Sequence, residues 1–257
     1  MYLIDVFFTG YANDAPFLIN QIVDQWRYNG QIIGREIPLF LAQQEDQQGF
    51  ALRVVCPEQQ SLLPDYHNQP VQNALQQAEN RGIFFDSFQV VADDLNSDST
   101  SATAKPNWQL LYTTYLQSCS PLHSGDDLSP IPLYLAFRDA PHLSQDMIKW
   151  QENWQACDQL QMNGSALEQA ALNELSAVDS TLFKHGYALR QEIEQHTHIP
   201  TYYYLYRVGG ESLASEQQRC CPRCHSDWRL ATSLFDMIYF KCDNCRLVSN
   251  LSWSFAE

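Results

Sequence analysis

Two cysteine pairs near the end of the chain constrain its fold more than any other feature of the sequence. Cys221 and Cys224 form the first pair, Cys242 and Cys245 form the second, and seventeen residues separate the pairs. Each C-x-x-C turn presents two sulfurs to one ion, and two turns complete the tetrahedron that Zn²⁺ accepts at about 2.3 Å per sulfur. The spacing fits the established four-cysteine zinc pattern. We therefore predict one Zn²⁺ bound by these four thiolates.

The predicted metal is structural, because protein sulfurs fill all four positions and leave none for water or substrate. Iron in a rubredoxin-like site would use the same geometry, but the chain offers no redox partner motif. Cys220 adjoins Cys221 and could compete as a ligand, although only Cys221 gives the two-residue turn. In a reducing compartment, we expect Cys56, Cys119 and Cys157 to be small buried apolar residues.

The overall charge argues against a protein that coats nucleic acid. The chain carries a net charge of −15, from 30 acidic residues and 15 lysines and arginines, whereas duplex-binding proteins usually show the opposite balance. Residues 217–257 differ, because their five basic and four acidic side chains give a formal +1. Any contact with nucleic acid is therefore expected to be local and confined to this segment.

Cations and aromatic rings in the last segment could form a small platform for bases and phosphates. The candidate cations are Arg223, Arg229, Lys241 and Arg246, and the rings are Trp228, Tyr239, Phe240 and Trp253. The alternative is that the rings are the miniature core of the module and the cations are solvated, which we favour for the rings because so small a module has little else to bury.

The sequence shows no membrane or export signal. No stretch approaches the roughly 18 apolar residues of a transmembrane helix, and residues 1–5 lack the basic and apolar regions of a signal peptide. We expect a cytoplasmic protein with no membrane contact.

Residues 1–94 show the strand and helix order of a ferredoxin-like α+β domain. Predicted strands cover 2–8, 32–41, 50–56 and 83–91, with Pro38 making the second an edge or bulged strand. One helix begins near Asp14 and ends at Asn29-Gly30, and a second, with Val71, Ala74 and Ala78 on one face, ends before Gly82.

A polar linker at 95–106 is predicted to lead into a mixed domain at 107–208 and then into a zinc ribbon at 217–257. The mixed domain is expected to hold strands at 108–115, 131–137 and 201–207 and about three helices, one capped by Ser144 and one by a Ser165 and Glu168 capping box. Short strands near 227–231, 237–241 and 247–253 would form the small sheet of the ribbon.

Together with the cysteine pairs, three motifs carry a family resemblance. They are Ser-Pro-Leu at 120–122, Pro-Ile-Pro-Leu-Tyr at 130–134 and Pro-Thr-Tyr-Tyr-Tyr-Leu-Tyr-Arg at 200–207. The chain resembles, over most of its length, a bacterial family of unknown function described as zinc-ribbon-containing, with nucleic-acid binding inferred from the ribbon. Only Cys221, Cys224, Cys242 and Cys245 carry over as site residues. Ribbons often have glycine after each cysteine pair, where this chain has His225 and Arg246.

Three other patterns admit a functional interpretation beside a structural one. Residues 48–55 partly echo the RNA-binding signature of a related sheet, but an inward-facing strand explains them better. His196 and His198 could be a metal-binding pair, but no third ligand is identifiable nearby, and a polar helix end explains them better. The 118–127 loop with Cys119, His123 and Asp126 could also bind a metal, although its spacing fits no standard site.

The strand at 201–207 carries four tyrosines. Alternation would place Tyr202, Tyr204 and Tyr206 on one side and Tyr203 on the other, one set in the core and the other facing a partner.

The sequence favours a binding or adaptor protein. The first hypothesis is docking of the ribbon on nucleic acid or a nucleic-acid-bound assembly. The second is a protein scaffold that uses the sheet edge or the tyrosine strand as an interface. An enzyme with a site between the body domains is a third, which is unsupported because no Ser-His-Asp order, phosphate loop or HExxH motif occurs.

Overall fold

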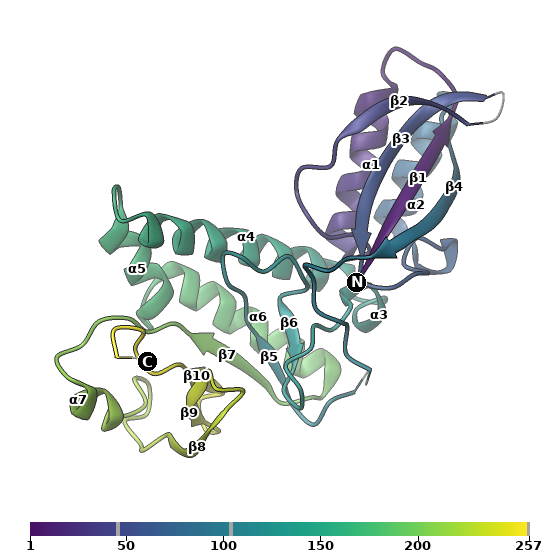
Figure 1. Ribbon diagram of the computed structural model, residues 1–257. Coiled ribbons are helices and arrows are strands. Elements are labelled where there is room, and N and C mark those ends of the chain that lie inside the picture. The colour runs from purple at the N-terminus through teal and green to yellow at the C-terminus, as the bar shows by residue number, and fades with distance from the viewer. Residues whose placement is uncertain (45–46, 103–104, 256–257) are drawn as a thin grey trace. The chain divides into compact units, whose positions relative to one another are not determined.

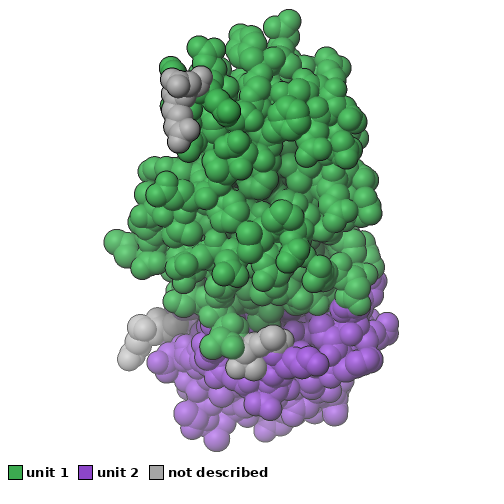
Figure 2. Space-filling view, turned by 90° about the vertical axis from the view of Figure 1, so that its right-hand side faces the viewer, with its two compact units in different colours: residues 1–102, 118–120, 130–148 green, residues 103–117, 121–129, 149–257 purple. Residues whose placement is uncertain are grey.

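The computed structural model describes residues 1–44, 47–102 and 105–255, which form a mixed α and β structure with two sheets and several helices (Figure 1). The described chain divides into two compact units (Figure 2). The first unit contains residues 1–102, 118–120 and 130–148. The remaining described residues form the second unit, which includes all four paired cysteines.

The first unit is built on a four-stranded sheet with two helices. Its main elements are β1 (Tyr2–Thr9), α1 (Ala15–Asn29), β2 (Leu39–Gln44), β3 (Gln47–Cys56), the 3-10 turn η1 (Pro64–Tyr66), α2 (Gln69–Glu79) and β4 (Phe84–Asp93). The strand order is β2-β3-β1-β4, and each neighbouring pair is antiparallel. The two helices lie on the same side of the sheet (Figure 1). The core lies between the sheet and the two helices and includes Ile4 and Phe8 of β1 and Ile19 and Trp26 of α1.

Local sequence explains where both helices begin and end. Pro16 stands in the first turn of α1, where a missing N–H costs nothing, and Gly30 ends the helix with a φ of 78°. Asn68 caps α2 by accepting a hydrogen bond from the Val71 N–H at 3.1 Å. These local signals account for the start and end of α1 and for the start of α2.

Two predicted strands are wrong in this unit. The strand expected at 32–41 begins only at Leu39, because Pro38 precedes it and lacks an N–H, while Ile33 makes a single isolated bridge to Val55. The segment expected as a strand at 131–137 contains a short helix, α3 (Leu133–Ala136), with Pro132 at its N-cap. A short apolar run does not distinguish the two states by periodicity.

The second unit contains a six-stranded sheet and most of the helices. Its elements are β5 (Gln109–Leu111), β6 (Leu122–Ser124), α5 (Glu168–Ser176), α6 (Thr181–Thr197), β7 (Thr201–Leu205), α7 (Leu213–Gln217), β8 (Arg229–Leu234), β9 (Ile238–Cys242) and β10 (Leu247–Ser249). The helix α4 (Pro141–Asn163) starts in the first unit and continues into the second. The strand order is β6-β5-β7-β10-β9-β8.

The strands that carry the cysteines share this sheet with the strands that precede them. β10 is antiparallel to β9 but pairs in parallel with β7, with Leu247 opposite Tyr203. β7 in turn pairs in parallel with β5. The strands β8, β9 and β10 are therefore joined to the rest of this sheet through the pairing of β10 with β7.

β7 is buried on both sides, so the expected partner-facing set of tyrosines is wrong. Tyr202, Tyr203 and Tyr204 are each at most 2% exposed, and Tyr206 just beyond the strand is half-buried. The reason is that β7 is an inner strand of the sheet, as in sheets covered on both faces. The Tyr203 ring packs edge-on against Trp150 of α4, with 5.7 Å between ring centroids.

Two predicted helix starts are also wrong. Ser144 lies inside α4, which begins three residues earlier at Pro141. The residue before α5 is Leu167 in a left-handed conformation, so Ser165 and Glu168 do not form the expected capping box. Among the described residues, no helix combines the length and apolar character needed to cross a bilayer.

Candidate metal centre

The first cysteine pair lies on a tight turn just before β8. The Cys221 N–H donates to the Ser226 carbonyl and the His225 N–H donates to the Cys221 carbonyl, both at 2.9 Å. His225 takes a left-handed φ of 59°. The position that is often glycine in ribbons thus takes a conformation that favours glycine, at a backbone cost of about 1–2 kcal/mol. The turn is tight despite the histidine.

The second pair spans the turn between two antiparallel strands. Cys242 is the last residue of β9, Cys245 lies in the turn, and β10 begins at Leu247, which is opposite Cys242 in the ladder. Arg246 follows Cys245 with a φ of 50°. Both pairs therefore end in the same left-handed step.

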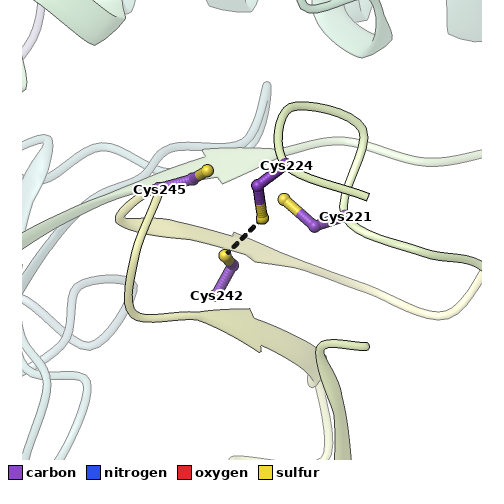
Figure 3. A group of neighbouring side chains, drawn as sticks. All are labelled: Cys221, Cys224, Cys242 and Cys245. Carbon is purple, nitrogen blue, oxygen red and sulfur yellow. Dashed lines mark hydrogen bonds between the residues drawn. The ribbon is translucent and has the colours of Figure 1, made fainter. Parts of the chain in front are cut away.

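The two turns bring all four sulfurs together. The Sγ atoms of Cys221, Cys224, Cys242 and Cys245 lie within 4.8 Å of one another, and 3.5 Å separates those of Cys224 and Cys242 (Figure 3). A tetrahedral ion with bonds of about 2.3 Å needs sulfurs about 3.8 Å apart. The arrangement is therefore able to hold one metal ion.

Burial and hydrogen bonding affect the sulfurs differently. The Ser226 hydroxyl, 2.9 Å from the Cys224 sulfur, lowers the pKa of Cys224 to about 6, whereas burial raises the pKa of Cys221 and that of Cys245. A bound cation favours every thiolate, so binding would release protons.

Cys220 lies outside this group. Its side chain is exposed, and its sulfur is 4.0 Å from the carbonyl oxygen of Gln218. The other two suggested metal sites are likewise not assembled among the described residues, where the four cysteines are the single cluster of potential ligands. The segment 118–127, expected as a loop, contains β6, and its Asp126 accepts hydrogen bonds from Asn107. His198 ends α6 in a left-handed conformation.

Of the four candidate aromatic rings in this segment, two are in the core and two are at least partly exposed. Trp228 and Phe240 are buried, with 5.3 Å between their ring centroids, and the Arg219 guanidinium lies over both rings. Tyr239 is half-buried, and Trp253 is 50% exposed. The core role expected for the rings is thus confirmed for Trp228 and Phe240.

Two of the four candidate cations are engaged with groups of the same unit. Lys241 forms an ion pair with Asp243 and donates to the Tyr202 hydroxyl at 3.1 Å. Arg246 donates to that hydroxyl at 3.0 Å and lies 3.4 Å from a carboxylate oxygen of Glu194. These contacts tie the second turn to β7 and α6.

The other two cations are exposed and lie near the first turn. The Arg223 guanidinium lies 4.1 Å from the centroid of the Tyr187 ring on α6. Arg229 makes a hydrogen bond of 3.4 Å to the Gln217 carbonyl. Arg223 and Arg229 are therefore the cations of this set best placed to meet an external group.

Sequence reasoning missed the groups of α6 and β7 that hold the centre in place. The Tyr187 hydroxyl donates to the Cys245 carbonyl at 2.9 Å, Glu194 pairs with Arg246, and Tyr202 receives two cations. No local pattern marks these residues, because each acts on a segment more than 35 residues away. An open hollow of about 600 Å³ beside the second turn is lined by Arg190, Glu194 and Arg246, among others, and its cations and acids are paired.

Comparison with known proteins places the chain among relatives of unknown function. Models of three families, each described as a domain of unknown function, match consecutive parts: DUF8589 at residues 1–92, DUF2310 at 103–206 and DUF8594 at 210–255. A Haemophilus influenzae protein described as uncharacterized is 62% identical over 260 residues, which cover 99% of this chain and all of that protein. The chain belongs to the same family.

A second Haemophilus influenzae protein with the same description is 65% identical over 201 residues, or 78% of this chain and 95% of that protein. No solved structure matches the chain significantly. These matches confirm membership of a family of unknown function, and their descriptions name neither a zinc ribbon nor a nucleic-acid role. The four cysteines fall within the third matched domain.

Proposed function

We propose that this chain is a binding or adaptor protein with a C-terminal zinc ribbon, residues 217–257, built around one structural Zn²⁺. The observation that carries the proposal is the convergence of four sulfurs within 4.8 Å, from two turns of the spacing that zinc sites use. The metal shapes a surface and performs no reaction, because protein fills the tetrahedron. In the same proposal, residues 1–94 form a ferredoxin-like domain, residues 95–106 a linker and residues 107–208 a mixed domain. The whole protein would act in the cytoplasm.

Metal analysis of the purified full chain tests the centre. Wild-type protein is expected to carry about one Zn²⁺ per chain and to be colourless, whereas iron with four thiolates would be coloured. Cys242→Ser should lose the metal, while Cys220→Ser, which changes an exposed neighbouring cysteine outside the cluster, should keep it. Wild-type protein with no metal, or equal loss in both variants, would refute the proposal.

Charge supports a protein partner over a long nucleic acid. The net charge of −15 opposes polyanions, and Lys241 and Arg246 are already engaged by Asp243, Glu194 and Tyr202. We therefore propose a protein as the principal partner of the adaptor.

Local contact with a nucleic acid is a second candidate, supported by the exposed Arg223 and Arg229. If they meet phosphates, binding of a labelled single-stranded oligonucleotide to the full chain should weaken steeply between 50 and 200 mM salt, about 0.7 logarithmic units per contact per decade. The double variant Arg223→Gln with Arg229→Gln should lose this binding, whereas Arg138→Gln, an exposed arginine of the first unit, should not. Affinity that ignores salt or the double change would rule this candidate out.

A further inference from the structure

The two outer strands of the first unit's sheet differ in the features that block pairing with a strand of another chain. β4 carries the exposed acids Asp86 and Asp93 and has two irregularities in its pairing with β1. β2 at the opposite edge has the sequence Leu-Phe-Leu-Ala-Gln-Gln and contains no charge. Charges and bulges are the usual means by which sheets block pairing with another chain. By that measure β4 is protected and β2 is open.

β2 also exposes large apolar side chains. Phe40 is 53% exposed and Leu41 is 70% exposed, and Tyr11 beside them is 73% exposed. These three residues line an open hollow of about 590 Å³ that also includes Ile37 and Phe50. An apolar, uncharged outer strand next to a hollow is a surface on which another strand can pair and bury side chains.

We infer that β2 is the interface of a homodimer, in which two copies of the chain pair their β2 strands antiparallel about a twofold axis near Leu41. Two copies that each carry −15 repel each other overall, which disfavours contact through acidic surfaces, whereas the six residues of β2 carry no charge. A twofold interface must be complementary to itself, and an uncharged apolar strand meets that condition in antiparallel pairing.

The exposed apolar side chains supply a large part of the area that a specific dimer interface needs. With about 200 Å² for each full side chain, the exposed fractions of Tyr11, Phe40 and Leu41 amount to roughly 400 Å² per copy, or roughly 800 Å² per dimer. The backbone of β2 and the remaining residues of the hollow bring this total towards the roughly 1,000 Å² expected of a specific interface. The inference does not depend on the metal centre.

Sedimentation velocity of the full chain from about 1 to 100 µM tests the interface. Wild-type protein should sediment as a dimer of twice 29.6 kDa. Leu41→Lys should raise the dimer dissociation constant at least about 100-fold, because each copy loses a buried leucine and gains a charge at the axis. Val91→Lys is the matched control, since Val91 is 47% exposed on β4, and it should remain dimeric.

Circular dichroism and thermal melting must first show that each variant is folded. If Leu41→Lys fails to fold, Leu41→Gln takes its place with the same expected direction. A wild-type chain of 29.6 kDa throughout the range would overturn the inference and leave β2 for a different partner. A dimer that survives the Leu41 change, or that the Val91 change disrupts equally, would overturn it as well.

Discussion

Replacing Gly186 by alanine should destabilise the protein, although helix propensity alone predicts the opposite. Gly186 lies in the middle of α6, and alanine is ordinarily better than glycine there by about 1 kcal/mol. In this helix a Cβ at position 186 would lie less than 3.0 Å from the indole nitrogen of Trp150 and from the ring of Tyr203. The glycine therefore allows α6 to approach these two rings.

The size of the effect follows from the burial of those rings. Trp150 and Tyr203 are both 0% exposed, so neither can move away without disturbing its own neighbours. Overpacking of a core costs about 1–3 kcal/mol, and two close contacts to immobile rings suggest the upper end. After the propensity gain of about 1 kcal/mol, the net loss should be about 2 kcal/mol, or about 4–8 °C in Tm.

Urea and thermal unfolding monitored by tryptophan fluorescence measure this change. The control is His185→Ala at the adjacent exposed position of α6, which should raise stability by about 0.5 kcal/mol through propensity alone. If both variants were stabilised, α6 could not lie against Trp150 and Tyr203 as described, and the reasoning would be refuted.

Three further predictions concern single side chains. Burial lowers the pKa of His123 to about 4, so between pH 6.5 and 4 the unfolded chain binds a proton that the folded chain does not. The free energy of unfolding should therefore fall by about 3 kcal/mol as the pH is lowered through that window. In urea titrations, His123→Leu should remove this part of the pH dependence. Asn68→Ala should lower unfolding free energy by about 1 kcal/mol, because the cap of α2 and a 2.8 Å hydrogen bond to Asn29 are lost; an unchanged urea midpoint would contradict this. His225→Gly should raise the free energy of unfolding by up to about 1 kcal/mol, and with it Tm, because glycine adopts the φ of 59° without strain. A lower Tm would count against the described turn.

Local signals in the sequence predicted the parts of the fold that depend on neighbouring residues. The spacing of the cysteines was enough to anticipate that Cys221, Cys224, Cys242 and Cys245 would lie together, while the identity of the metal stays a prediction. The alternation around Leu52 and Val54 indicated β3, and Asn29-Gly30 marked the end of α1. Each of these features is specified by a few adjacent side chains.

The features that were missed depend on long-range contacts. The sequence does not show whether the strand that carries Tyr202 and Tyr203 is an inner or an outer strand of its sheet. Only the pairing of β7 with β5 and β10 buries both side chains. Leu167 adopts a left-handed conformation that the sequence, which has no glycine at that position, does not indicate. Around the metal centre, Tyr187 and Glu194 act across large sequence separations, so no motif identifies them.

The parallel ladder between β10 and β7 has a consequence for any shortened form of the chain. Because Leu247, Val248 and Ser249 occupy the hydrogen-bonding edge of β7, cutting the chain near Gly210 would leave that edge exposed, with three tyrosines beside it. The truncated remainder should then aggregate rather than persist as an intact body, since an uncovered apolar strand recruits other strands. The C-terminal segment is thus part of the same sheet as the residues before it and covers one edge of β7.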